Sequence, residues 1–151
     1  MSAKVRGEAR ADMPSTPHQS HGERREAPRT IILSLPLPSP LLTPNVRMHW
    51  AERARHVKAQ RYDARLLTYC QLPEVVEALR PGARLRLDVE VRPRPRMKRL
   101  DDDNLWSALK SYRDGIADAL LVDDQRFVIG ELTWSATRSG ELVLTLTEVQ
   151  P

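Results

Sequence analysis

The chain contains little cysteine, few aromatic residues and no long apolar run. Its 151 residues include one cysteine, Cys70, so no disulfide can form within the chain, which suits a reducing cytoplasm. No run of 18 apolar residues occurs, so we expect no transmembrane helix, and the N-terminus lacks the apolar core of a secretory signal. Aromatic residues make up only 5% of the chain, so its core must consist mainly of Leu, Val, Ile and Ala.

The chain has an excess of positive charge, with a formal net charge of +4 and a pI of about 9.6. A basic balance permits nucleic-acid binding but does not establish it. Residues 1–29 mix Pro, Ser, His, Gly and charged residues without apolar periodicity, so we predict a disordered tail. His18 and His21 lie in this tail and lack ligand-type partners at a recognised spacing, so we interpret them as solvated. We expect one folded domain, residues 30–151.

Apolar periodicity predicts six elements in that domain. They are a strand at 30–35, a basic helix at 48–69, a strand at 83–91, a helix from Asp103 to Leu120, and strands at 126–134 and 141–149. We expect the last two strands to form a hairpin. The predicted fold class is α/β, a small mixed sheet with two helices packed on it, in the order β-α-β-α-β-β.

Two apolar stripes define the predicted buried faces of the helices. The stripe of the first helix is Ala51, Ala54, Val57, Tyr62 and Leu66. The stripe of the second helix is Leu105, Leu109, Tyr112, Ile116 and Leu120. Both follow the three- and four-residue spacing of an amphipathic helix.

Carboxylates stand at both ends of the second predicted helix. Asp101 and Asp103 lie where an extended segment becomes helical, and Asp123 and Asp124 follow the end of the stripe. Grouped carboxylates repel one another unless a cation offsets their charge, and Mg²⁺ prefers such oxygen ligands. A bound Mg²⁺ can activate water for displacement at phosphorus. The alternative is that Asp103 only caps the helix and "VDD" is a solvated turn, and spacing alone does not decide between them.

Five cations precede the acidic motif within eight residues: Arg92, Arg94, Arg96, Lys98 and Arg99. The interleaved prolines favour an extended backbone. Such a cluster either is a solvated linker or contacts DNA phosphates, which would offset the repulsion between DNA and the aspartates.

The motifs "DDDN" at a helix start, "DAL", and "VDD" before a strand together resemble the RusA family of Holliday junction resolvases. The predicted element order is similar as well, over about residues 30–149. The resemblance implies a small homodimeric, Mg²⁺-dependent endonuclease, encoded by a bacterium or phage, that nicks two strands symmetrically across a four-way DNA junction.

The resemblance also implies roles for individual residues. The family's catalytic aspartates fall on Asp101, Asp103 and Asp124, with Asp123 in support as a metal ligand. The family often has a lysine where this chain has Ser107, and Lys110, one turn later, is the candidate to steady the phosphate. Asn45 and Arg47 match a place where the family has Asn and basic residues, so we add them to the expected DNA contacts.

Several points stay open at this level. The family's mid-helix aspartate corresponds either to Asp114 or to Asp118, and both face away from the apolar stripe, which favours solvation. The apolar residues of the last strand, Leu142, Leu144 and Leu146, are candidates for a dimer interface. The alternative function is a non-catalytic DNA-binding module that retains the same fold, and a third is an interaction protein without DNA affinity.

Overall fold

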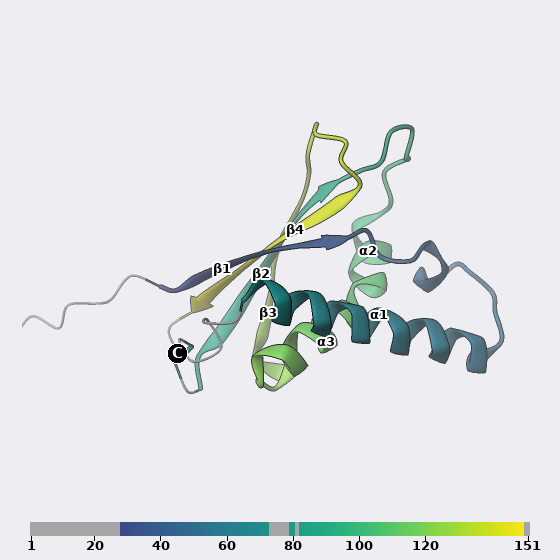
Figure 1. The fold of residues 1–151 in the computed structure, drawn as a ribbon. Helices are drawn as coiled ribbons and strands as arrows, with labels where there is room; N and C mark the ends of the chain where they lie inside the picture. The colour runs from purple at the N-terminus through teal and green to yellow at the C-terminus, as the bar shows by residue number, and fades with distance from the viewer. Residues whose placement is uncertain (1–27, 73–78, 81, 150–151) are drawn as a thin grey trace, which may run out of the picture.

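The computed structural model describes residues 28–72, 79–80 and 82–149. The protein has a mixed α/β fold with a four-stranded sheet and three α-helices (Figure 1). Its elements are β1 (Thr30–Pro36), α1 (Trp50–Gln71), β2 (Arg84–Arg92), α2 (Asp102–Ala108), α3 (Lys110–Leu120), β3 (Phe127–Trp134) and β4 (Glu141–Val149), with 3-10 turns η1 (Pro40–Leu42) and η3 (Asp124–Arg126). The predicted tail lies outside the described residues apart from its last two. No helix in the described part of the chain is both long and apolar enough to cross a membrane.

The sheet has the strand order β1-β4-β2-β3, and the predicted hairpin between residues 126–134 and 141–149 is wrong. β3 instead pairs in parallel with β2, and β4 lies antiparallel between β1 and β2. Parallel neighbours need a crossover connection, which α2 and α3 supply. No side chain of β3 is fully buried, as suits an edge strand, whereas β4 buries alternate residues between two neighbours.

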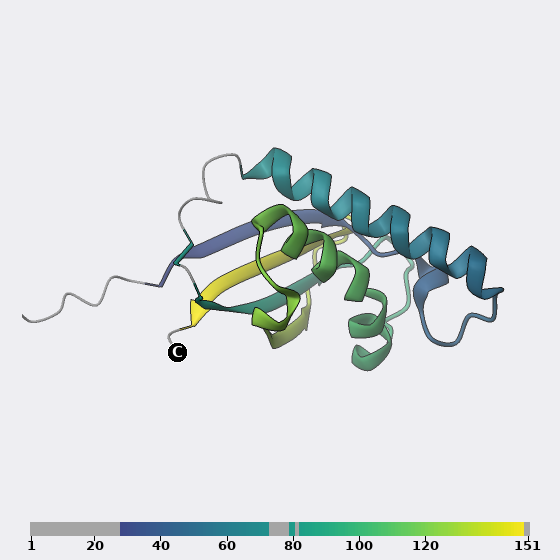
Figure 2. The same cartoon turned by 90° about the horizontal axis from the view of Figure 1, so that it is seen from below.

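One face of the sheet and the helices that cover it form the core (Figure 2). Alternate residues of β1, β2 and β4 point to this face and are at most 3% exposed: Ile31, Leu33, Leu35, Leu85, Leu87, Val89, Val91, Leu142, Leu144 and Leu146. The predicted alternation of residues 83–91 is thereby confirmed. The apolar side chains of the last strand lie in the core of their own chain, so they do not supply the surface of the expected dimer interface.

The outer edge of β1 is bound by a side chain from α1. Gln71 accepts a hydrogen bond from the backbone N–H of Ser34 through Oε1 at 2.9 Å, and donates from Nε2 to the Ser34 carbonyl at 2.8 Å. Two residues further along β1, Pro36 has no N–H to offer. The amide side chain of Gln71 thus pairs with β1 much as a neighbouring strand would.

The face of α1 that is buried against the rest of the protein differs from the face that its apolar stripe predicted. The buried residues of α1 are Gln60, Ala64 and Thr68, whereas Tyr62 and Leu66 of the predicted stripe are 62% and 50% exposed. Gln60 is only 6% exposed, and its amide is fully hydrogen-bonded within the protein. A buried polar side chain whose partners come from distant segments is invisible to a count of apolar residues.

The second predicted helix is divided in two at Leu109, which ends α2 and begins α3. Its whole apolar stripe is nevertheless buried, as predicted. Gln60 donates from Nε2 to the carbonyl of Ala108 at 2.8 Å and to the hydroxyl of Ser111 at 2.6 Å. A side chain that takes a helix carbonyl competes with the helix's own hydrogen bond, which explains a kink at this position.

α1 and α3 pack closely at Gly115. A Cβ atom at this position would overlap the carbonyl oxygen of Arg61 and approach the Cβ of Ala64 to 2.8 Å. Only glycine therefore lets the two helices come this near.

We expect Gly115→Ala to lower the free energy of unfolding by about 1–3 kcal/mol, the usual cost of overpacking. In an exposed helix the same change would stabilise by up to about 1 kcal/mol, so the sign of the effect tests the close approach. Urea unfolding measures it, with Lys110→Ala on the exposed face of α3 as the control, expected to change stability by less than about 0.5 kcal/mol. An increase in stability for Gly115→Ala would contradict the packing.

Candidate functional site

The acidic motif of the sequence forms an open hollow at the start of α2, which we call the front acidic hollow. Asp101, Asp102 and Asp103 line it together with Arg99 and Leu100. Asp101 is the N-cap residue of α2, yet its carboxylate makes no capping hydrogen bond. Arg99 Nη2 lies 3.7 Å from Asp102 Oδ1. The carboxylates of Asp101 and Asp103 are exposed and form no ion pair with any residue that the structure describes.

The convergence of Asp101 and Asp103 on one point stays a prediction. Both line the same hollow, although Asp103 belongs to α2 and not to an extended stretch. The alternative that Asp103 only caps the helix is wrong, because Asp101 is the N-cap residue of α2. The carboxylate of Asp101 makes no capping hydrogen bond either.

A second acidic hollow lies at the end of α3, and we call it the rear acidic hollow. Its charged residues are Arg61, Asp114, Asp118, Asp123 and Asp124. Arg61 of α1 donates from Nε and Nη2 to the two carboxylate oxygens of Asp118, at 2.7 and 2.8 Å. These hydrogen bonds lower the pKa of Asp118 and raise the pKa of Arg61, which the charges of Asp118, Asp114 and Asp124 raise further. The rear hollow thus already contains a cation of the protein's own.

The two aspartates after α3 differ in their surroundings. Asp123 is the N-cap residue of η3, and its carboxylate accepts a hydrogen bond from the backbone N–H of Gln125 at 2.9 Å. Asp124 is exposed and lies next to it in the rear hollow. Asp123 is therefore occupied locally, and Asp124 is the more available carboxylate of the pair.

The structure does not bring the predicted metal ligands together within one chain. Asp101 and Asp103 lie in the front hollow, Asp123 and Asp124 in the rear hollow, and α2 and α3 separate the two (Figure 2). Over residues 28–72, 79–80 and 82–149, no group of three or more His, Cys, Asp or Glu side chains is placed to hold one metal ion. The free pair in the front hollow still suits Mg²⁺, which is often bound by one or two carboxylates together with water and substrate phosphate.

Lys110, the candidate replacement for the family's lysine, does not line the front hollow. It is exposed on the first turn of α3 and shares a further hollow with Ser107, Arg53 and Asp114. Asp114 also lines the rear hollow, so Lys110 is closer in its surroundings to the rear acidic group.

Two of the predicted phosphate contacts are engaged within the protein. Arg92 donates from Nε to Glu90 at 2.9 Å and from Nη1 to Glu141 at 3.1 Å, so two carboxylates already match its charge. The guanidinium of Arg99 lies 5.6 Å from the ring centroid of Trp134, a cation–π distance.

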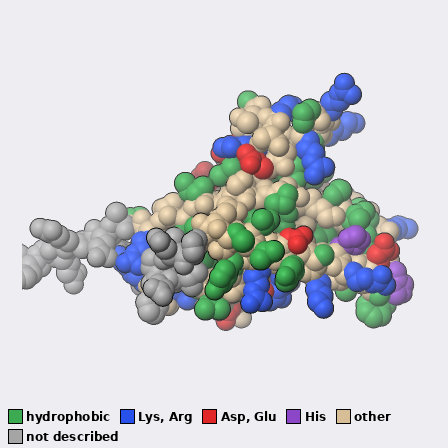
Figure 3. All heavy atoms as spheres, viewed as in Figure 1, with side chains coloured by type: hydrophobic (Ala, Val, Ile, Leu, Met, Phe, Trp, Pro, Cys, Tyr) green, Lys and Arg blue, Asp and Glu red, His purple; other side chains and the backbone are tan. Residues whose placement is uncertain are grey.

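The other predicted cations lie on exposed loops. Arg94, Arg96 and Lys98 belong to the loop between β2 and α2, and Asn45 and Arg47 are exposed before α1. Figure 3 shows Lys and Arg side chains on the two loops that project from one end of the sheet.

Sequence reasoning missed one cation at this end, Arg138, in the loop between β3 and β4. Its Nη1 donates to the backbone carbonyl of Arg94 at 3.2 Å and so connects the loop after β3 with the loop after β2. The loop sequence "SATRSG" contains the residue, but only the strand order explains why it meets Arg94. Arg61 was missed for the same reason, since its partner Asp118 lies 57 residues away in the sequence.

We expect Arg61 and Asp118 to show a coupling free energy of about 0.5–1 kcal/mol in a double-mutant cycle with Arg61→Met and Asp118→Asn at neutral pH. The pKa of Asp118 is lowered in the folded chain, so the contribution is complete above its unfolded value and is lost as the pH falls through the folded value. Urea unfolding of the four proteins over this pH range measures it. Coupling that persists once the carboxyl is protonated would contradict the ion pair.

No family model matches this chain. A comparison with individual proteins finds a relative of similar length. A protein of Xylella fastidiosa (strain Temecula1 / ATCC 700964), described as "Uncharacterized protein", is 40% identical over 123 residues, which cover 78% of this chain and 76% of that protein. An identity of this level over most of both chains shows common descent, and the protein therefore belongs to the same family as this Xylella fastidiosa protein.

Proposed function

We propose that the protein is a Mg²⁺-dependent endodeoxyribonuclease that resolves four-way DNA junctions, with a fold and activity similar to those of the RusA family. One observation carries the proposal: the N-cap aspartate of α2, Asp101, leaves its carboxylate unused beside the equally free Asp103. Carboxylates without a partner next to a cationic loop serve no evident packing purpose, but they are the ligands that a hard cation needs.

The front acidic hollow supplies the metal site in this proposal. Asp101 and Asp103 hold Mg²⁺, which, when bound, polarises the phosphodiester and lowers the pKa of an attacking water. Arg99 keeps Asp102 engaged at 3.7 Å, so this carboxylate is set apart from the other two.

The basic end of the sheet supplies the DNA contacts. Arg94, Arg96 and Lys98 follow β2 directly and precede the acidic motif, so a DNA strand held on them passes the front hollow. Phosphate contacts of this kind set affinity and orientation but carry little sequence information.

A homodimer completes the proposal, because a four-way junction needs two opposed nicks and a two-fold dimer presents identical sites in opposite senses. α1 has an exposed apolar face that supports self-association: Tyr62, Leu66 and Tyr69 are 62%, 50% and 62% exposed and line a shallow hollow with Arg65. Figure 3 shows hydrophobic side chains along this side of α1. Exposed apolar patches of this kind often mark interfaces.

We propose that Asp124, with Asp123 next to it, reaches the metal from the second copy of the chain. Within one chain Asp124 lies in the rear acidic hollow, away from Asp101 and Asp103. Its carboxylate is exposed, so a second copy can present it without unfolding any element. Lys110, on the same side as the rear hollow, would approach the phosphate in the same way.

Asp103→Asn should abolish junction cleavage while preserving junction binding, because Asn is nearly isosteric but a poorer ligand for Mg²⁺. We expect the rate to fall by more than about 100-fold, since even residues that only support metal ligands cost about 10–100-fold. Asp102→Asn is the matched control, because Asp102 is paired with Arg99 and should remain dispensable. Cleavage of a synthetic four-way junction and a binding assay without Mg²⁺ give the two readouts, and wild-type rates for Asp103→Asn would rule the metal site out.

Mixing two inactive variants tests whether Asp124 acts from the partner. Asp103→Asn and Asp124→Asn should each fail to cut alone, whereas their mixture should recover nicking, because each mixed dimer has one site with all three aspartates. If Asp124 acted within its own chain, no mixed dimer would have a complete site and the mixture would stay inactive.

The alternative, a DNA-binding module without catalysis, is favoured by the density of exposed cations alone. It predicts salt-dependent junction binding with no cleavage at any Mg²⁺ concentration. The same cleavage assay separates the two, since only the nuclease makes paired nicks.

A further inference from the structure

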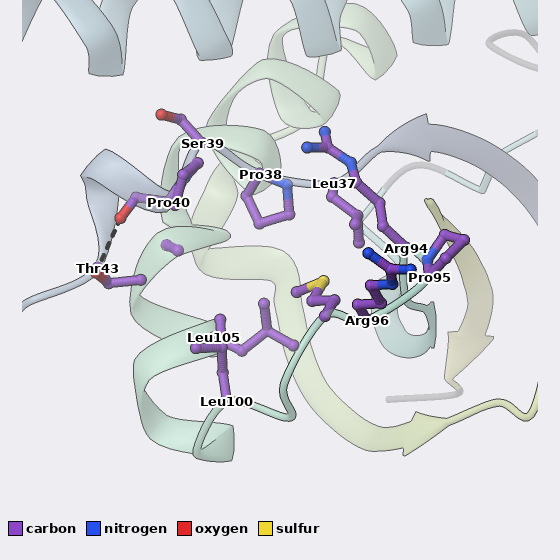
Figure 4. Close-up of a pocket in the computed structure, with 12 residues that line it drawn as sticks. Leu37, Pro38, Ser39, Pro40, Thr43, Arg94, Pro95, Arg96, Leu100 and Leu105 are labelled. Carbon is purple, nitrogen blue, oxygen red and sulfur yellow. Dashed lines mark hydrogen bonds between the residues drawn. The ribbon is translucent and has the colours of Figure 1, made fainter. Parts of the chain in front are cut away.

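A cavity of about 350 Å³ lies between the loop after β1, the loop after β2 and helix α2 (Figure 4). The two loops supply most of the lining residues, and α2 supplies the other two, Leu105 and Ala108. The volume is at the lower end of the range for small-molecule sites, about 300–1,000 Å³, which suits one flat ring system with its attached group.

The walls of the cavity are apolar and well fixed. Pro38 and Pro40 come from the loop after β1, and Pro95 from the loop after β2. Helix α1 fixes the first of these loops, because the backbone N–H of Ser39 donates to Gln60 Oε1 at 2.8 Å. Thr43 closes the loop by donating from Oγ1 to the Pro40 carbonyl at 2.9 Å (Figure 4). A pocket with such walls is largely formed before any ligand arrives.

Two arginines, Arg94 and Arg96, line the same cavity, and both side chains lie toward Leu37 in Figure 4. Neither forms an ion pair with a residue in the part of the chain that the structure describes. Arg94 is positioned by its neighbours, since its carbonyl accepts from Arg138 and its side chain lies against Gly140, where a Cβ would approach Arg94 Cγ to 2.9 Å. The cavity thus combines an apolar interior with unpaired positive charge.

The cavity also adjoins the front acidic hollow. Leu100 lines both of them, so the cavity and the hollow that contains Asp101 and Asp103 are neighbours.

We infer that this cavity binds the base of an unpaired DNA nucleotide, while Arg94 and Arg96 bind the phosphates on either side of that nucleotide. Enzymes that take a base out of the stack hold it between apolar side chains, and the cost is least for a base that is already unpaired. Guanidinium groups match phosphate in charge and geometry. The inference rests on the proposed function: a base held here directs the adjoining phosphodiester across Leu100 toward Asp101 and Asp103, so the protein would select positions at a branch where a base is free to leave the stack.

Fluorescence of 2-aminopurine tests the inference without any cleavage. This adenine analogue is quenched by stacking, so we place it beside the branch of a four-way junction and bind the protein in EDTA. The emission should rise with saturable binding. Thr43→Phe, which fills the cavity from its edge, should lose this rise while a gel-shift assay still shows the junction bound.

A second variant keeps the test decisive if Thr43→Phe does not fold. Arg96 has a φ of 66°, a left-handed conformation that Asn tolerates, so Arg96→Asn removes the charge with little backbone cost. Lys98→Asn is the matched control, because Lys98 is an exposed cation of the same loop that does not line the cavity. Arg96→Asn should reduce the emission at saturation, whereas Lys98→Asn should leave it unchanged and alter only the affinity.

The outcomes separate this inference from the proposed function. A wild-type protein that cuts junctions in Mg²⁺ without raising the emission overturns the base pocket and keeps the nuclease. A protein that raises the emission in a cavity-dependent way but never cuts keeps the base pocket and overturns the nuclease. Equal emission for Thr43→Phe, Arg96→Asn and wild type at full binding also overturns the pocket, and a protein that binds no junction overturns both.

Discussion

The buried amide of Gln60 joins three segments that the sequence keeps far apart. Its oxygen accepts from Ser39 in the loop after β1, and its nitrogen donates to Ala108 and Ser111 at the junction of α2 and α3. One side chain therefore sets the wall of the apolar cavity, the kink between the two helices and the seating of α1. An apolar residue here would leave buried polar groups without partners, each at a cost of about 1–3 kcal/mol.

The two acidic hollows differ in how the protein compensates their charge. In the rear hollow the guanidinium of Arg61 is bound by Asp118 and attracted by the remaining aspartates, so the group is stable without a further cation. In the front hollow the available guanidinium, Arg99, is shared between Asp102 and the ring of Trp134. An arginine thus compensates the carboxylates at the end of α3, whereas the carboxylates of Asp101 and Asp103 at the start of α2 stay without a cation among the described residues.

The periodicity of apolar residues predicted which side chains of a single helix or strand are buried. The apolar stripe of 105–120 and the alternation of 83–91 are both buried as expected, because a 3.6- or two-residue repeat fixes which side chains share a face. The sheet order was not predictable in this way, since pairing β3 with β2 in place of β4 depends on contacts across the whole domain. The buried face of α1 was missed because Gln60 is polar, and the separation of Asp101 from Asp124 because their spacing along a kinked helix does not reveal a distance.

The amide of Gln71 on the edge of β1 has a consequence for how copies of this chain can meet. The outward backbone groups of β1 belong to Thr30, Ile32, Ser34 and Pro36. Gln71 occupies both groups of Ser34, and Pro36 has no N–H, so only the first half of this edge can pair fully with another strand. A second sheet needs a row of such groups to extend the first. Pairing with another strand is therefore interrupted over residues 34–36, and contact between copies beside this part of β1 depends on side chains.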